Sequence, residues 1–179
     1  NELYLFLKNR GHNISDVILL GLVKKSKYKE DEYYDFFRNR LIFPIKNYKS
    51  EVIAFGGRSL DNSEIKYINS SDSQLFKKSF NLYNINLAIE EKRLLPNLYV
   101  AEGYMDVVSL YQNGFKTSVA PLGTALTKFQ IDALWKYCKN PTIIFDGDEA
   151  GQKAAMRAAK ISLSILKPGH SLKFCILPK

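Results

Sequence analysis

The chain has 179 residues, of which 46% are hydrophobic and 25% charged, and its formal net charge is +8. These values are typical of a globular protein with one full core or two small subdomains. No apolar run approaches the roughly 20 residues that span a bilayer, so we expect no membrane association. The positive charge favours a polyanionic partner, most simply a nucleic acid. The chain starts at Asn1 without a signal peptide, so we expect a piece of a longer, cytoplasmic protein.

The two cysteines, Cys138 and Cys175, stand in apolar surroundings and form no C-x-x-C pair. This pattern is typical of buried, reduced thiols. The two histidines, His12 and His170, are isolated from them in the sequence. Because a zinc site needs three or four ligands close together and the chain offers only these isolated residues, we expect no zinc in this part of the chain.

The first part of the chain mixes short elements. Residues 1–40 are predicted to form short helices around a charged linker. Residues 41–45 (LIFPI) and 52–58 (VIAFGGR) are predicted to form two strands joined by a polar turn. Pro44 favours an edge strand or a bulge, and the Gly56-Gly57 pair indicates a bulge or a backbone that lies close to another group.

From Pro96 onward the pattern becomes regular, with apolar strands that alternate with helices. The predicted strands cover 98–102, 116–122, 141–145 and 171–177, and the predicted helices cover 104–114, 128–138 and 149–167. Thr127 and Gln130 have the spacing of a capping box at the start of the second helix. The alternation predicts β-α-β units, and hence an α/β fold with a parallel sheet covered on both faces.

Acidic residues gather where two of these strands end. Glu102 ends the strand 98–102, Asp146 follows the strand 141–145, and Asp148 lies two residues further on. Open parallel sheets bind ligands at the carboxyl ends of their strands, so these carboxylates meet in one crevice if the two strands are neighbours. Like charges at that distance repel. A hard divalent cation such as Mg²⁺ removes the repulsion and suits phosphoryl transfer.

Asp148 has a second interpretation, because an Asp at this place can cap the following helix. That interpretation leaves Asp146 and Glu102 unexplained. Three glycines, Gly103, Gly123 and Gly147, each follow a predicted strand. There a backbone turns sharply or approaches a phosphate closely.

Two segments resemble the hallmark motifs of the toprim domain, VAEGYMDVVSL at 100–110 and IIFDGDEAGQKAA at 143–155. Further segments resemble, in family order, the bacterial replicative DNA primases of the DnaG type. They are RLIFPI (40–45), VIAFGGR (52–58), KYINS (66–70), FKKSFNLYN (76–84) and PLGTALT (121–127). The resemblance covers nearly the whole chain, and the segments before residue 96 are specific to primases.

The resemblance implies a toprim domain at 96–179, preceded at 1–95 by a smaller α+β subdomain of the primase catalytic core that is incomplete at its start. It implies DNA-directed synthesis of short RNA primers on single-stranded DNA, by two-metal nucleotidyl transfer from ribonucleoside triphosphates with Mg²⁺, or Mn²⁺ in its place. It also implies a bacterial cytoplasmic location, and a replicative helicase as partner through a C-terminal domain absent here. The family continues past CILPK into another acidic motif, so we expect the metal site to be incomplete.

Site residues follow from the matching motif positions. The resemblance implies that Glu102, Asp146 and Asp148 are catalytic metal ligands and that Asp106 is a further ligand. The implied nucleotide-binding or nucleic-acid-binding residues are Arg38, Arg40, Arg58, Lys66, Tyr67, Asn69, Lys78 and Gly123. Two departures concern Ser79 and Asn84, which stand where the family usually has glycine. Asn tolerates a left-handed conformation, whereas Ser79 leaves the local turn open.

Two other functions stay open from the sequence. One is a toprim nuclease or a topoisomerase-like enzyme; a topoisomerase needs a tyrosine nucleophile, usually from another domain. The other is a nucleic-acid-binding module that keeps the toprim fold but has no catalytic activity. Such a module would be expected to lose the carboxylates.

Overall fold

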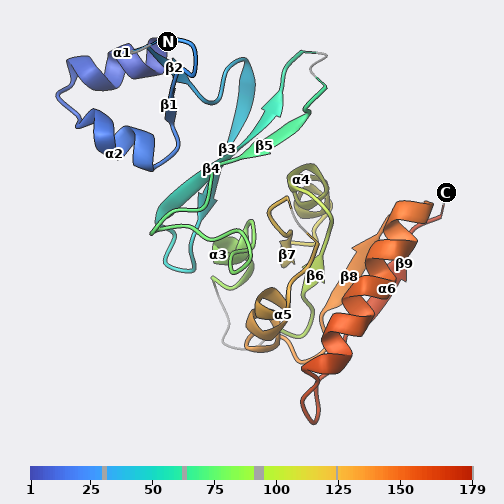
Figure 1. Cartoon of the computed structure of the whole chain (residues 1–179). Helices are drawn as coiled ribbons and strands as arrows, with labels where there is room; N and C mark the ends of the chain where they lie inside the picture. Colours follow the sequence, from blue (N-terminus) through green and yellow to red (C-terminus); the bar gives the residue numbers. More distant parts are fainter. Residues whose placement is uncertain (30–31, 62–63, 91–94, 124, 179) are drawn as a thin grey trace. The chain divides into compact units, whose positions relative to one another are not determined.

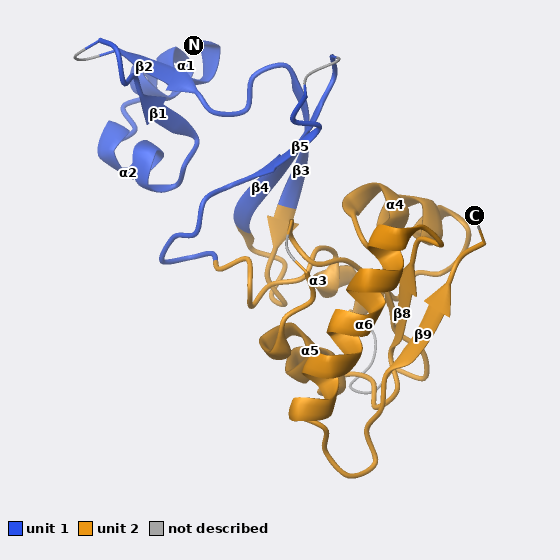
Figure 2. Cartoon of the chain, turned by 45° about the vertical axis from the view of Figure 1, so that its right-hand side comes forward, with its two compact units in different colours: residues 1–44, 53–76 blue, residues 45–52, 77–179 orange. Residues whose placement is uncertain are grey.

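A computed structural model describes residues 1–29, 32–61, 64–90, 95–123 and 125–178 (Figure 1). The chain forms two compact units, residues 1–44 with 53–76 and residues 45–52 with 77–179 (Figure 2). Within the described ranges, no helix has the length and apolar character needed to cross a membrane. The division predicted at residue 96 stays a prediction.

The chain begins with two short helices, α1 (Glu2–Asn9) and α2 (Ile14–Leu19), as predicted. They are followed by an antiparallel pair of strands, β1 (Val23–Lys25) and β2 (Tyr33–Asp35). These strands lie in the stretch predicted as a charged linker, of which residues 30–31 are outside the described part. Strands of three residues are too short to show an alternating pattern in the sequence.

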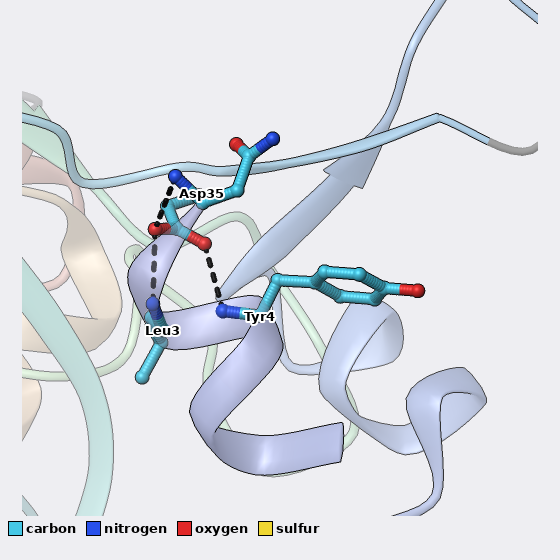
Figure 3. A network of polar contacts seen from close by, with 4 residues as sticks. Leu3, Tyr4 and Asp35 are labelled. Carbon is cyan, nitrogen blue, oxygen red and sulfur yellow. Dashed lines mark hydrogen bonds and ion pairs between the residues drawn. The ribbon is translucent and has the colours of Figure 1, made fainter. Parts of the chain in front are cut away.

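Asp35, at the end of β2, holds the start of α1 (Figure 3). Its carboxylate accepts the backbone N–H groups of Leu3 at 3.1 Å and Tyr4 at 2.9 Å, two of the groups that a helix start leaves without partners. Burial acts to raise the pKa of Asp35, but these hydrogen bonds lower it, and the pKa lies below its ordinary value. A residue of the strand pair thus replaces the usual local cap.

A three-stranded sheet follows, with the order β3-β4-β5. Its strands are β3 (Arg40–Lys46), β4 (Val52–Ser59) and β5 (Tyr67–Asn69). Pro44 therefore lies on an edge strand, where its missing N–H is tolerated, and this confirms the prediction. A Cβ on Gly57 would lie 2.8 Å from the Phe37 ring, so the predicted close approach of the backbone is also confirmed.

The larger unit contains a four-stranded parallel sheet with the order β7-β6-β8-β9. Its strands are β6 (Tyr99–Val100), β7 (Ser118–Val119), β8 (Thr142–Phe145) and β9 (Lys173–Ile176). Its helices are α3 (Ile85–Ala88), α4 (Tyr104–Gln112), α5 (Lys128–Trp135) and α6 (Glu149–Ser164). The α/β prediction is confirmed, and each predicted strand and helix of this part is found, over a shorter range than predicted.

Two hydrophobic clusters cover the two faces of this sheet. Val100 and Val119 pack into the larger cluster, to which α5 and α6 contribute. The next residues, Ala101 and Ala120, pack with Val107 of α4 in a smaller cluster. Because successive residues of a strand point to opposite faces, α4 covers one face and α5 with α6 the other. The predicted coverage of both faces is confirmed.

Two local predictions had different outcomes. Asn84 adopts the left-handed conformation, with φ 65°, and its side chain donates to the carbonyl of Ser118 at 3.0 Å. It therefore fills a turn that suits glycine, as expected. Cys138 is buried as predicted, but Cys175 is exposed, which corrects the prediction of two buried thiols. Cys175 belongs to β9, an edge strand of the sheet.

Candidate active site

The strand order creates a switch point between β6 and β8. The connection after β6 leads to β7 on one side, and the connection after β8 leads to β9 on the other. In open parallel sheets the crevice for ligands lies at the carboxyl ends of the strands at such a point. Glu102 follows β6 and Asp146 follows β8, so both acids stand at the mouth of this crevice.

Glu102 and Asp146 are in direct contact. The backbone N–H of Asp146 donates a hydrogen bond to Oε1 of Glu102 at 3.2 Å. The strands that carry them are paired in parallel, with Val100 opposite Ile143. The predicted crevice required these two strands to be neighbours, and they are.

The other two acids are held by backbone groups of helix starts. Oδ1 of Asp148 accepts the N–H of Gly151 at 2.7 Å, so Asp148 is the N-cap of α6. Oδ2 of Asp106 accepts the N–H of Gly103 at 2.9 Å at the start of α4. The capping interpretation of Asp148 is thus confirmed. Each bond uses one carboxylate oxygen and fixes the direction of the other.

Gly151 lets α6 begin directly against the backbone of Asp146. A Cβ at this position would lie 2.1 Å from the carbonyl oxygen of Asp146, far inside contact distance. Only glycine therefore allows the first turn of α6 to pack on the acidic loop. This role was not predicted from the sequence, although a glycine within a helix is costly enough to be a signal.

The chemistry of these donors fits a magnesium ion. All four carboxylates are exposed, and Mg²⁺ usually binds one or two protein carboxylates and completes its shell with water and phosphate oxygens. Among the described residues, no three His, Cys, Asp or Glu side chains lie close enough together to hold a metal by themselves.

A cavity of about 400 Å³ lies next to Glu102, between the strand ends and α6. Gly123, with a left-handed φ of 72°, lines it as well. So does Arg157 of α6, which the sequence analysis did not select as a site residue. The spacing of Ala150, Ala154 and Arg157 along α6 places them on one helical face, and this pattern could have identified Arg157.

Most of the predicted nucleic-acid-binding residues lie in the smaller unit. Arg38 and Arg40 line a cavity of about 540 Å³ together with Tyr34 and Phe36. Arg40 also donates to the carbonyls of Ile65 and Lys66, at 3.0 and 3.3 Å. These contacts bring Arg40, the first residue of β3, close to the segment KYINS.

Arg58, Tyr67 and Asn69 lie on the adjacent strands β4 and β5. The guanidinium of Arg58 lies 5.9 Å from the centre of the Tyr67 ring, and the two residues are direct partners in the sheet. Within the part of the chain that the structure describes, the buried Oδ1 of Asn69 has no hydrogen-bond donor. An unsatisfied acceptor of this kind indicates a place for a ligand or water.

Lys78 and Gly123 lie in the larger unit, with the carboxylates. The carbonyl of Lys78 accepts a hydrogen bond from the Gln130 side chain at 3.0 Å, and Thr127 Oγ1 donates to the carbonyl of Ser79 at 2.6 Å. The predicted capping box of Thr127 and Gln130 is confirmed. These bonds hold the turn at Ser79, whose conformation could not be predicted from the sequence.

Comparison with known proteins identifies two families along the chain. A family model for the DNA primase catalytic core, N-terminal domain, matches residues 1–89, and a Toprim-like model matches residues 99–175. Together they leave only short segments unmatched.

Relatives and solved structures agree with these matches. The DNA primase of Clostridium acetobutylicum is 41% identical over 177 residues, which cover 99% of this chain and 28% of that protein. The Escherichia coli primase catalytic core is similar with a TM-score of 0.89 and 38% identity, over 97% of this chain and 56% of that one. A DnaG primase catalytic domain bound to ssDNA gives a TM-score of 0.87 over the same shares, with 38% identity. The chain thus spans little more than a quarter of the curated relative.

Proposed function

The chain belongs to the bacterial DNA primase family, and we propose that it forms the part of a primase catalytic core that makes short RNA primers on single-stranded DNA. Ribonucleoside triphosphates are the substrates in this proposal. Residues 96–179 act as the toprim domain and residues 1–95 as the subdomain that precedes it.

One observation carries the proposal. Glu102 and Asp146 stand at the carboxyl ends of two neighbouring parallel strands, at the switch point of the sheet, and are joined by a hydrogen bond of 3.2 Å. This is the place where an α/β sheet binds ligands. The acids there have the oxygen chemistry that divalent cations require.

Glu102, Asp106, Asp146 and Asp148 are the residues that would hold Mg²⁺, or Mn²⁺ in its place. Bound there, the metal would activate the attacking 3′-hydroxyl and neutralise the charge that develops on the phosphates. The chain's own contribution is to fix the carboxylates: backbone N–H groups hold Asp106 and Asp148, and Glu102 holds the loop of Asp146.

The basic and polar residues bind substrate and template in this proposal. Lys66, Lys78 and Arg58 neutralise phosphates, as do Arg38 and Arg40 beside the aromatic rings of their cavity. Tyr67 offers a ring face to a base, and Asn69 offers its unsatisfied oxygen to a base or sugar. Gly123 lets a phosphate approach the backbone closely.

Template binding is supported by the similar primase domain whose structure was determined with ssDNA. A replicative helicase is the proposed partner of the whole protein, through a C-terminal domain. We place the whole protein in the bacterial cytoplasm.

The test combines metal binding with synthesis. Calorimetry with Mn²⁺ should show binding to the chain and loss of that binding in Asp146→Asn. A template-directed assay should then show incorporation of labelled ribonucleotides by the longer catalytic core and none by its Asp146→Asn form. Glu149→Gln is the matched control, because Glu149 is an adjacent exposed acid that pairs with Lys153 at 2.5 Å. Cleavage of DNA in place of synthesis would contradict the proposal.

A further inference from the structure

Two exposed phenylalanine rings stack on each other in the larger unit. The ring centres of Phe80 and Phe129 are 4.2 Å apart, with an angle of 22° between the planes. Phe80 is 53% exposed and Phe129 43% exposed. Each ring shields only one face of the other, and the rest of both rings remains largely exposed to water. Neither residue belongs to the carboxylate site or to the basic residues assigned above.

Both rings are fixed by the backbone that carries them. Gln130, which is fully buried, donates to the carbonyls of Lys78 at 3.0 Å and Asn81 at 2.8 Å, on both sides of Phe80. Thr127 Oγ1 donates to the carbonyl of Ser79 at 2.6 Å. Residues 78–81 are therefore tied to the first turn of α5, which carries Phe129. A ligand that stacks here loses little affinity to the ordering of the protein.

The segments that carry the two rings also carry lysines. Lys128 Nζ lies 5.1 Å from the centre of the Phe129 ring, and Lys77, three residues before Phe80 in the sequence, is exposed. Lys136 is exposed two turns further along α5, on the side of Phe129. Asp132, the one acid of α5, is hydrogen-bonded to Lys167. One lysine thus lies over the Phe129 ring, two more are exposed on the adjoining segments, and the acid of α5 is paired with its own lysine.

Flat apolar rings among cations match one chemistry in particular. The π-face of a nucleic-acid base stacks on an aromatic ring, while its phosphates need positive charges close by. A purely apolar partner would have no use for the lysines. A duplex hides the faces of its bases within the stack.

We propose that Phe80 and Phe129 form a stacking platform for a base of single-stranded DNA, with Lys77 and Lys128 contacting the neighbouring phosphates. This inference rests on the proposed function, because the strand on the platform is the template. It adds a template contact that does not involve the metal-binding carboxylates.

The experiment uses a short oligodeoxythymidine that carries one 2-aminopurine, a fluorescent base that is quenched when it stacks. The wild-type chain should bind the oligonucleotide and quench it. In the Phe80→Leu, Phe129→Leu double variant, affinity should fall about tenfold, the lower part of the range for one lost base–aromatic stack, and the quenching should be lost. Lys128→Gln should make the fall of log affinity with log salt concentration less steep, by about one unit of slope.

Phe115→Leu is the matched control, because Phe115 is 44% exposed in the same unit and packs edge-on against Tyr99. It should bind as the wild type does. Phe80→Tyr, Phe129→Tyr restores flat rings and should restore quenching, which separates lost stacking from a disturbed fold.

Wild-type affinity and quenching in the double leucine variant would overturn the inference, as would a wild-type chain that does not bind the oligonucleotide. Asp146→Asn separates this inference from the proposed function. It should quench like the wild type while it loses metal binding. If the full catalytic core makes primers but the 2-aminopurine is not quenched, only the stacking platform is overturned. If the 2-aminopurine is quenched but the full core makes no primers, only the proposed function is overturned.

Discussion

Oε1 of Glu102 accepts the backbone N–H of Asp146 at 3.2 Å, across the carboxyl ends of two neighbouring strands. The bond joins the two acidic motifs, which lie 44 residues apart in the sequence. It places the Glu102 carboxylate at the start of the loop that carries Asp146 and Asp148. A change at Glu102 should therefore affect both the charge of the site and the position of this loop.

Glu102→Gln separates these two effects. Glutamine keeps an oxygen that accepts the Asp146 N–H but removes the negative charge. We expect thermal stability close to that of the wild type and a loss of Mn²⁺ affinity of at least about tenfold, since even outer-shell partners of a metal contribute about 10–100-fold. Glu102→Ala should lose the hydrogen bond as well and be less stable. Calorimetry and thermal unfolding measure both effects, and unchanged Mn²⁺ affinity in Glu102→Gln would exclude Glu102 as a ligand.

Asp148 is the N-cap of α6 and also a proposed metal ligand. The substitution Asp148→Asn separates these two roles. Asn caps a helix about as well as Asp, so Asp148→Asn should unfold like the wild type but bind Mn²⁺ more weakly. Asp148→Ala should also lose about 1 kcal/mol of stability with the cap. Urea unfolding and Mn²⁺ titration of both variants give the answer. If Asp148→Asn binds the metal normally, Asp148 is only a cap.

Gly151→Ala tests the packing of α6 on the acidic loop. Alanine favours a helix more than glycine by about 1 kcal/mol, so propensity alone predicts a gain in stability. The Cβ would meet the carbonyl oxygen of Asp146 at 2.1 Å. We therefore expect a net loss of about 1–3 kcal/mol, as for other overpacked sites. Gln152→Ala, at the next and exposed position of the helix, is the control and should be neutral or slightly stabilising in the same urea titration.

Gln130→Leu tests the clamp between residues 78–81 and α5. The substitution keeps most of the side-chain volume but leaves the carbonyls of Lys78 and Asn81 without their donor. A buried acceptor left unpaired costs about 1–3 kcal/mol, so unfolding should need less urea. Proteolysis between residues 77 and 81 should also become faster. Wild-type stability together with wild-type proteolysis would show that the clamp does not hold the loop.

The cap by Asp35 predicts a dependence of stability on pH. Its pKa is lower in the folded than in the unfolded chain, so the unfolded state takes up the proton first as the pH falls. The stabilisation is complete above the ordinary carboxyl pKa of about 4 and is lost as the pH falls through the lower folded value. Asp35→Asn can accept only one of the two N–H groups and does not titrate.

The wild type should therefore be more stable than Asp35→Asn at neutral pH by about 1 kcal/mol, and this difference should shrink towards pH 3. Urea unfolding of both proteins at the two pH values measures it. An equal difference at both values would contradict the role of the charge.

The sequence predicted the parallel sheet well, because each β-α unit has its own periodic pattern and its own helix start. It also predicted that Glu102 and Asp146 lie where two strands end. The sequence could not show that β6 and β8 are neighbours, since strand order is decided by packing of the whole sheet. The direct contact between the two acids depends on this order.

Features that join distant residues were missed for the same reason. The strands β1 and β2 are each three residues long and gain their stability from pairing. The contact of Gly151 with Asp146, the stack of Phe80 on Phe129 and the position of Arg157 in a cavity depend on how finished elements pack. A hydrophobic pattern indicates which face of a helix or strand is buried, but it does not indicate which other element packs against that face.

The position of Asp35 also has a consequence for the order of events during synthesis. Helix α1 has eight residues, fewer than the about 12–15 that an isolated helix needs for marginal stability in water. Its cap is translated 31 residues after Tyr4, the residue that it holds. The start of α1 therefore gains its cap only after β2 has been translated, and we expect α1 to fold together with the β1–β2 pair.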